Sequence, residues 1–327
     1  MSDTLNYRQV IARAIADEMR DDPDVFMIGE DIGAAGGAFK TSAGLFEEFG
    51  PRRVRDTPIS EQAIVGAALG AAIMGLRPIA EIMFADFAGV CYDQIVNQVA
   101  KHRYMTGGQV TVPLTIRMAN GAGTGFAAQH SQAGENWFLN VPGLKVVVPG
   151  TVEDLYGLLR GSIRDNDPVL FFEHKGLFSL KGEVPTGDDA VLPLGVAAVV
   201  REGSDVTIVA TQQMRHRAVE AADALAAAGI EAEVIDPRTL IPFDDDAVAR
   251  SLAKTSRLLV VQESPRDGSW GASLVSRMTT EHFTLLDAPP SLLSSPDTPV
   301  PYASILEEAW LPSVDAIVAK AKELVAF

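Results

Sequence analysis

Glu61 is the residue whose type and position most directly suggest chemistry. It precedes an apolar run, residues 63–76, that contains no charged side chain. Ser60 follows the extended Thr57-Pro58 pair and is a good helix N-cap, so we expect Glu61 in the first turn of a helix. Two interpretations stay open. The carboxylate offsets the helix dipole, an effect of ~0.3–1 kcal/mol, or it lies in a poorly hydrated pocket and shares a proton with a ligand.

His130 is a second candidate, because it lies in a polar loop that is rich in glycine. Gly121, Gly123 and Gly125 precede it, and the surrounding residues have no apolar periodicity. A general acid or base, or a donor to an oxyanion, is placed in this way. A structural loop histidine is the alternative. The chain has five histidines, and no pair of them has the spacing of zinc ligands.

Apolar strands alternate with helices in both halves of the chain. We expect strands at 25–28, 79–84, 113–118, 145–148, 169–173, 205–210, 233–236 and 258–262, with helices at 7–20, 61–76, 86–105, 151–165, 213–228, 244–254, 271–282 and 313–325. Residues 174–194 have little periodicity and are expected to be a linker. This alternation predicts an α/β protein with two doubly wound, mostly parallel sheets, in domains 1–185 and 186–327.

Ligands of such sheets bind where parallel strands end at their carboxyl ends. Glu30 follows the first buried strand, the loop with His130 follows the strand at 113–118, and Glu61 follows an extended segment. We therefore expect these three side chains to face one crevice.

Composition excludes several classes of partner. The net charge of −16 argues against nucleic acid and anionic membranes. The single cysteine, Cys91, lies in a helical pattern and is expected to be a buried thiol. The N-terminus lacks the features of a signal peptide, and the 63–76 run is shorter than the ~20 residues that a bilayer requires. These features predict a cytoplasmic protein.

Known nucleotide-binding motifs and the nucleophile motif of serine hydrolases are absent from the sequence. The loop at residues 33–37 lacks G-x-G-x-x-G spacing, and there is neither a P-loop nor a G-x-S-x-G motif. The helix after Glu61 has Gly66 and Gly70 four residues apart, which favours close packing of another backbone. That backbone belongs either to another subunit or to the same domain.

Several of these motifs, in this order, resemble the β subunit of the thiamine-diphosphate-dependent 2-oxo acid dehydrogenase E1 component. They are found at residues 56–61, 66, 70, 75–78, 128–132, 142–147, 163–169 and 236–240, and the likeness extends from about residue 7 to about residue 325. Pyruvate, branched-chain 2-oxo acid and acetoin dehydrogenases have such subunits. The segments 84–94, 173–175 and 182–185 look most like the acetoin type.

The resemblance implies roles for individual residues. Glu61 would hydrogen-bond N1′ of the aminopyrimidine and favour the imino tautomer, which takes the C2 proton of the thiazolium ring. Met83 and Phe87 would contact the aminopyrimidine, Phe87 by stacking, and Glu30 and Ile59 would complete the cofactor contacts. His130 would face the substrate carbonyl. The matching positions for a structural potassium ion, bound mostly through carbonyl oxygens, are Leu114, Ser162, Ile163, Asp165 and Asp167.

The chain also lacks a motif that the superfamily uses to bind diphosphate. No Gly-Asp-Gly occurs, and Gly187-Asp188-Asp189 does not fit the motif. The resemblance thus implies that a separate α subunit supplies the diphosphate and Mg²⁺ ligands. The expected assembly is an α₂β₂ heterotetramer that passes an acyl group to a lipoyl acyltransferase, E2.

One departure from the family pattern concerns the substrate. Asn140 stands where such subunits usually have a histidine. The expected reaction is cleavage of a 2-oxo acid, pyruvate or branched-chain, or of acetoin. The alternatives are non-oxidative thiamine-dependent ketol transfer or decarboxylation with a separate α subunit, and a non-catalytic homologue.

Overall fold

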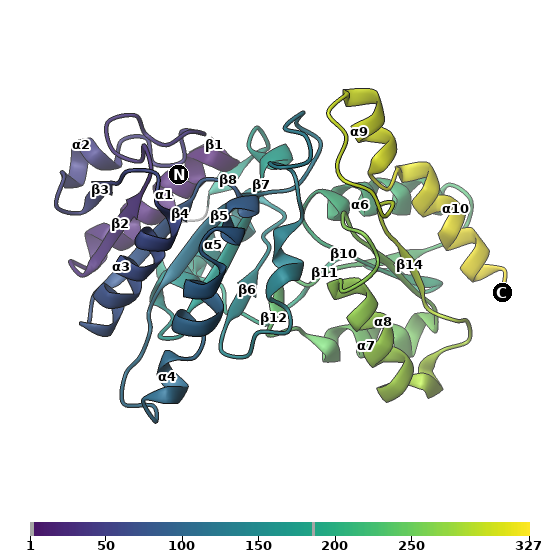
Figure 1. Ribbon diagram of the computed structural model, residues 1–327. Coiled ribbons are helices and arrows are strands. Elements are labelled where there is room, and N and C mark those ends of the chain that lie inside the picture. The colour runs from purple at the N-terminus through teal and green to yellow at the C-terminus, as the bar shows by residue number, and fades with distance from the viewer. Residues whose placement is uncertain (1–2, 185–186) are drawn as a thin grey trace. The chain divides into compact units, whose positions relative to one another are not determined.

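The computed structural model describes residues 3–184 and 187–327. The chain divides into two compact units, one of Met1–Asn120 with Asn140–Leu194 and one of Gly121–Leu139 with Gly195–Phe327. The predicted domain boundary between residues 185 and 186 lies outside the described residues. Each unit is built around its own sheet (Figure 1).

The main sheet of the first unit contains the strand order β6-β7-β5-β4-β2-β3, and all of these neighbours are parallel. Its strands are β2 (Val25–Gly29), β3 (Val54–Asp56), β4 (Arg77–Ile82), β5 (Thr115–Asn120), β6 (Lys145–Val147) and β7 (Val169–His174). A separate antiparallel pair consists of β1 (Asp3–Asn6) and β8 (Lys181–Val184).

Helices cover both faces of this sheet. On one face, α1 (Tyr7–Asp21) and α5 (Val152–Arg164) share a core with Val25 and Met27 of β2. The alternate residues Phe26 and Ile28 line a groove with Ala67 and Ala71 of α3 (Glu61–Ile73). Successive residues of a strand point to opposite faces, so α3 lies on the other side of the sheet from α1 and α5. The remaining elements are α2 (Leu45–Phe49), α4 (His102–Met105) and the short helices η1 (Ala85–Gly89), η2 (Gln94–Val99), η4 (Lys175–Leu177) and η5 (Asp188–Ala190).

The second unit contains a sheet with the order β14-β13-β10-β11-β9, in which only β9 runs antiparallel to its neighbour. Its elements are η3 (Gly134–Phe138), β9 (Ala198–Arg201), β10 (Val206–Ala210), α6 (Gln212–Ala226), β11 (Ala232–Asp236), β12 (Thr239–Ile241), α7 (Asp245–Thr255), β13 (Leu258–Val261), α8 (Trp270–Glu281), η6 (Phe283–Leu285), β14 (Ser291–Leu293), α9 (Ser304–Trp310) and α10 (Val314–Val325). Helices α6 and α10 lie along one side of this sheet and α7 and α8 along the other (Figure 1).

The predicted α/β class with doubly wound, mostly parallel sheets is confirmed. Two local predictions are wrong. The single helix expected at 86–105 is broken into η1, the π-helical segment η2 and the short α4. The segment 174–194, expected to be a linker, contains β8, which pairs with β1 at the start of the chain. A partner more than 170 residues away is a long-range contact that local periodicity does not report.

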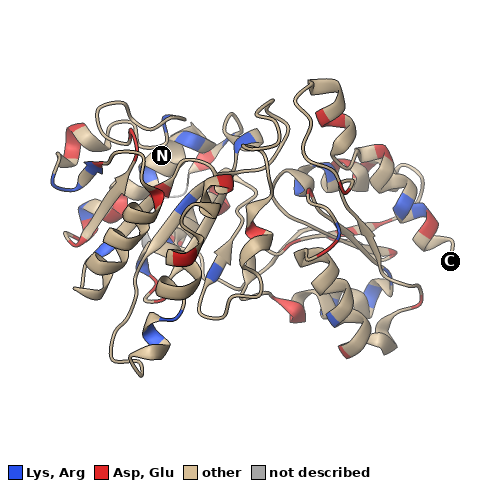
Figure 2. Ribbon diagram, viewed as in Figure 1, with Lys and Arg blue, Asp and Glu red and all other residues tan. Residues whose placement is uncertain are grey.

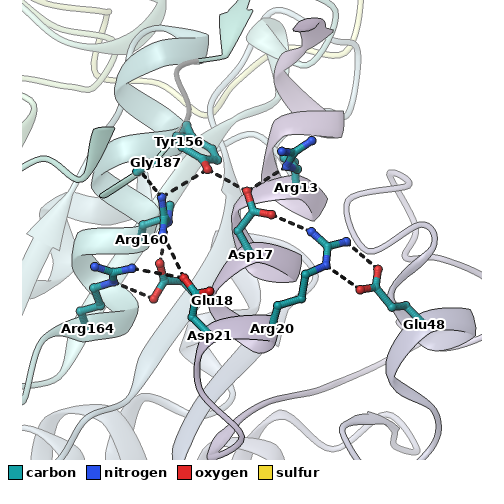
Figure 3. A network of polar contacts seen from close by, with 10 residues as sticks. All are labelled: Arg13, Asp17, Glu18, Arg20, Asp21, Glu48, Tyr156, Arg160, Arg164 and Gly187. Atoms are coloured by element: carbon teal, nitrogen blue, oxygen red, sulfur yellow. Dashed lines mark hydrogen bonds and ion pairs between the residues drawn. The ribbon is translucent and has the colours of Figure 1, made fainter. Parts of the chain in front are cut away.

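An ion network ties α1 to α5 (Figure 3). Glu18 accepts hydrogen bonds from Arg160 Nε at 2.6 Å and from Arg164 Nε at 2.8 Å. Asp17 accepts one from the hydroxyl of Tyr156 at 2.7 Å and pairs with Arg13 at 2.8 Å. Each buried carboxylate of this network therefore has a charged or hydrogen-bonding partner.

Candidate functional site

Glu61 is the first residue of α3, and its side chain is only 6% exposed. Ser60 is the N-cap as predicted, but its side chain does not cap the helix; its hydroxyl donates to the carbonyl of Pro58 at 2.9 Å. The side chain of Glu61 forms neither a hydrogen bond nor a salt bridge with any residue that the structure describes. A buried carboxylate without a donor in its own chain is costly unless a ligand or a partner supplies one.

Glu30 is a second buried carboxylate beside Glu61. It is 8% exposed, and its Oε1 has no hydrogen-bond partner among the described residues. Burial raises the pKa of Glu30, and the negative charge of Glu61 raises it further, while a hydrogen bond to the backbone of Ser60 opposes the shift. Two neighbouring carboxylates with no cation between them favour the protonation of one, which creates a donor as well as an acceptor.

Aromatic side chains gather at the carboxyl end of β4. Phe84 contacts Phe87 edge-to-face, with ring centroids 5.4 Å apart, and Phe39 contacts Phe84 at the same distance. Phe87 and Met83 are half-buried, so part of each side chain stays accessible to a ligand. Ile59, by contrast, is 83% exposed.

Cys91 is fully buried, as expected. Burial raises the pKa of its thiol to about 12, and the charge of Glu61 adds to the shift. The side chain therefore stays a thiol at neutral pH and does not act as a nucleophile.

Three charged side chains on the neighbouring strands β4, β5 and β7 form a buried ion network that no sequence motif identified. Arg117 of β5 pairs with Glu173 of β7 at 2.6 Å and with Glu81 of β4 at 2.8 Å. Burial raises the pKa of Glu173 to about 7, against the opposing effect of Arg117. Charged residues inside otherwise apolar strands were the available signal.

The loop that carries His130 belongs to the second unit. Gly121, Gly123 and Gly125 all have positive φ, which explains why glycine occupies these positions. His130 is half-buried, and its backbone N–H donates to the carbonyl of Ala127 at 3.4 Å. Because Glu61 lies in the first unit, the expected common crevice of Glu61 and His130 stays a prediction.

Cationic side chains contact three of the five positions predicted for potassium, namely Ile163, Asp165 and Asp167. Arg77 donates to the carbonyls of Ile163 at 3.2 Å and Asp165 at 3.1 Å, while the carbonyls of Ser162 and Leu114 accept backbone N–H groups. Each carbonyl oxygen has two lone pairs, so one remains for a cation at each position. The side chain of Asp167 pairs with Arg103 and, at 3.7 Å, with Lys145, which also pairs with the side chain of Asp165 at 2.6 Å.

Sequence comparison assigns a class to both units. A family model of the transketolase pyrimidine-binding domain matches residues 3–181, and one of the transketolase C-terminal domain matches residues 195–317. The chain is also similar to a solved structure described as a split-gene transketolase, inactive β4 tetramer, with a TM-score of 0.79, 23% identity and 98% of each chain covered. At that identity the likeness establishes the fold alone.

Full-length relatives narrow the class. The chain is 47% identical to the β subunit of acetoin:2,6-dichlorophenolindophenol oxidoreductase from Bacillus subtilis, over 99% of this chain and 96% of that one. It is 44% identical to the 2-oxoisovalerate dehydrogenase β subunit of the same organism, over 99% of each. It is also 44% identical to the pyruvate dehydrogenase E1 β subunit of Rhizobium meliloti, over 96% of this chain and 68% of that one. The chain belongs to this family of E1 β subunits, as its motifs predicted.

Three further properties concern the described part of the chain as a whole. Among the described residues, no helix is long and apolar enough to cross a membrane. Nor do three or more His, Cys, Asp or Glu side chains in the described part of the chain gather as a metal site. Basic and acidic side chains are interspersed along both units (Figure 2).

Proposed function

We propose that this chain is the β subunit of a thiamine-diphosphate-dependent E1 enzyme that cleaves a 2-oxo acid or acetoin and passes the acyl group to a lipoyl acyltransferase. The observation that carries the proposal is the carboxylate of Glu61 at the start of α3, which is buried and has no hydrogen-bond or ion-pair partner in the described part of the chain. Thiamine diphosphate contains an aminopyrimidine ring, and the domain that holds Glu61 matches the pyrimidine-binding model.

The residues around Glu61 fit one half of this cofactor. Glu61 would hold a proton at N1′ of the aminopyrimidine. The neighbouring carboxylate of Glu30 would influence, through its charge, how that proton is shared. Phe87 and Met83 would contact the ring faces, because both are apolar and half-buried. When bound, thiamine diphosphate supplies a carbanion that attacks a carbonyl carbon. The low exposure of both carboxylates keeps water from competing for the same hydrogen bonds.

A partner subunit would supply the other half of the cofactor site. The chain has no Gly-Asp-Gly motif for diphosphate and Mg²⁺, so an α subunit would complete an α₂β₂ heterotetramer. Helix α3 offers a surface for it, since Ala63, Ala67 and Gly70 are exposed and Met74 is 82% exposed. Ile59, at the start of this surface, would reach the cofactor only in the assembled complex.

Gly70 gives a direct test of this surface. Apart from its two neighbours and the backbone of its own helix, a Cβ at Gly70 meets no atom of the described residues within 4 Å, so Gly70→Leu should leave the isolated chain intact. In the complex it should overpack the contact, which typically costs ~1–3 kcal/mol, and shift sizing profiles toward smaller species. An unchanged heterotetramer would show that α3 faces solvent or a loosely packed neighbour.

The remaining expectations belong to the same proposal. His130 would donate to the substrate carbonyl, and Asn140, which is exposed, would distinguish this chain's substrate from those of relatives with histidine. A structural potassium ion would bind the carbonyls near Arg77. Replacing K⁺ with Na⁺ should then lower the thermal stability of the first unit. The enzyme would work in the cytoplasm.

The decisive experiment is reconstitution with the α subunit, followed by turnover of pyruvate, 2-oxoisovalerate and acetoin with 2,6-dichlorophenolindophenol as electron acceptor. Calorimetry should show weak or no binding of thiamine diphosphate to this chain alone and clear binding to the complex. Submicromolar binding by the chain alone would contradict the divided site. Acceptor-independent release of an aldehyde or transfer of a ketol group would favour the non-oxidative alternative, and inactivity on every substrate would favour a non-catalytic homologue.

A further inference from the structure

We propose that Glu307 is a positioning residue that holds the His130 loop, residues 121–132, in its working conformation. The inference rests on the proposed role of His130 and adds a residue that acts through it. Glu307 lies on α9, and the loop belongs to the same unit. Glu307 is more than 180 residues from the glycines that it contacts, so no local sequence pattern predicts this contact.

Both carboxylate oxygens of Glu307 accept hydrogen bonds from the backbone of the loop. Oε1 accepts a hydrogen bond from the N–H of Gly123 at 2.8 Å, and Oε2 accepts one from the N–H of Gly125 at 3.0 Å. Glu307 is only 3% exposed, and its side chain forms no salt bridge with any described residue. Its charge is thus directed at the loop amides, and hydrogen bonds to a charged acceptor are stronger than neutral ones.

The conformation of the loop explains why it needs an anchor. Gly121, Gly123, Gly125 and Ala127 have φ of 85°, 89°, 75° and 59°. Left-handed residues at alternate positions turn backbone N–H groups toward one side and create a concave anion site. In this chain Glu307 is that anion. Ala127 has a side chain and adopts this conformation against its preference, so the neighbouring contacts must hold it.

A second carboxylate fixes the start of the same loop. Glu263, which follows β13, accepts a hydrogen bond from the N–H of Ala122. At the far side, the Oδ1 of Asn136 accepts one from the N–H of Trp270 at 3.0 Å. Between these contacts, the backbone N–H of His130 donates to the carbonyl of Ala127. Ala127 lies two residues after Gly125, the last residue whose N–H donates to Glu307. A change at Glu307 therefore moves the histidine without touching it.

The test compares Glu307→Gln with Glu308→Gln in the reconstituted complex. Glu308 is adjacent on α9, but its side chain is 64% exposed and pairs with Arg217. Glutamine at 307 keeps one acceptor and turns an NH₂ group toward a backbone donor. We expect kcat for the active substrate among pyruvate, 2-oxoisovalerate and acetoin to fall roughly ten- to hundred-fold, as for small misplacements of a catalytic group. Exchange of the cofactor C2 proton should be unchanged, and Glu308→Gln should match the wild type.

A double variant separates positioning from general stability. In a His130→Ala background, Glu307→Gln should cause no further loss of turnover, because the group it positions is gone. Losses that multiply would overturn the proposal, as would normal turnover of Glu307→Gln. Hydrogen exchange adds a readout that needs no activity: the amides of Gly123 and Gly125 should exchange faster in Glu307→Gln than in Glu308→Gln. Equal exchange rates in the two variants would also overturn the proposal. A wild-type complex that turns over no substrate would instead reject the proposed function, and the hydrogen-exchange result alone would then test whether Glu307 holds the loop.

Discussion

Two groups of buried or half-buried carboxylates in the first unit have opposite surroundings. Glu18 in the network between α1 and α5 accepts hydrogen bonds from two arginines, and Asp17 is bound by arginines and a tyrosine (Figure 3). Among the residues that the structure describes, the side chain of Glu61 has no such partner, and one carboxylate oxygen of Glu30 has none. Both groups lie on helices or strand ends of the same fold, so packing alone does not account for the difference.

Under the proposed function, the first group serves stability and the second serves chemistry. A buried charge destabilises a fold unless it is paired and hydrogen-bonded, and the α1–α5 network meets that condition. The pair of Glu30 and Glu61 does not. Such a local cost persists where the site must stay open for a ligand, since a built-in arginine would neutralise the carboxylate that the ligand needs.

Removing Arg160 should have the largest effect on stability. Arg160 is 3% exposed and faces Glu18, which is 2% exposed. In Arg160→Met, Glu18 keeps only Arg164, and breaking a buried pair in this way costs roughly 3–5 kcal/mol. Urea unfolding of the isolated chain should show the loss, while turnover per assembled complex should stay normal. A loss under about 1 kcal/mol would mean that the network contributes no more than a surface pair does.

Glu61→Gln should have the opposite pattern. Glutamine keeps the shape but cannot share a proton, so turnover should fall by roughly 10²-fold or more. Stability should be equal or higher, because one of two unpaired carboxylates is gone. Glu47→Gln is the matched control, since Glu47 lies in the first turn of α2 but is exposed. If both variants keep normal turnover with saturating cofactor, Glu61 serves only the helix dipole.

Glu30→Gln should change how the free energy of unfolding depends on pH. The folded-state pKa of Glu30 is raised above its ordinary value of 4.5. Between pH 4.5 and the raised pKa, the folded state binds more protons than the unfolded state. The free energy of unfolding of the wild type therefore falls as pH rises through this range. The variant lacks this titration and should gain stability relative to wild type over the same window, by less than the loss in Arg160→Met. Parallel pH curves for the two proteins would show that Glu30 does not titrate differently on folding.

Local sequence pattern was sufficient for the main buried strands, for most of the long helices and for the position of Glu61, but not for the broken segment 86–105 or for contacts between distant segments. The apolar run after Glu61 and the proline before it located α3 and its acidic first turn, because these are local properties. Strand β8 escaped detection because its partner β1 is near the other end of the unit. The partners of the His130 loop, Glu263 and Glu307, are more than 130 residues away, and no spacing rule connects them.

The smallest expected effect distinguishes buried from exposed pairs within the network itself. Arg20 joins Asp17 at 2.7 Å and Glu48 at 2.6 Å, but its side chain is 46% exposed and that of Glu48 is 41% exposed. Solvent and salt screen such pairs, so Arg20→Gln should cost only ~0.2–1 kcal/mol, and the difference from wild type should shrink in 1 M salt. The cost of Arg160→Met should change far less with salt, because Glu18 is shielded from ions. Equal salt sensitivity of the two variants in urea unfolding would mean that the buried half of the network is solvated. The contrast between this network and Glu61 would then rest on the partners of each carboxylate and not on burial.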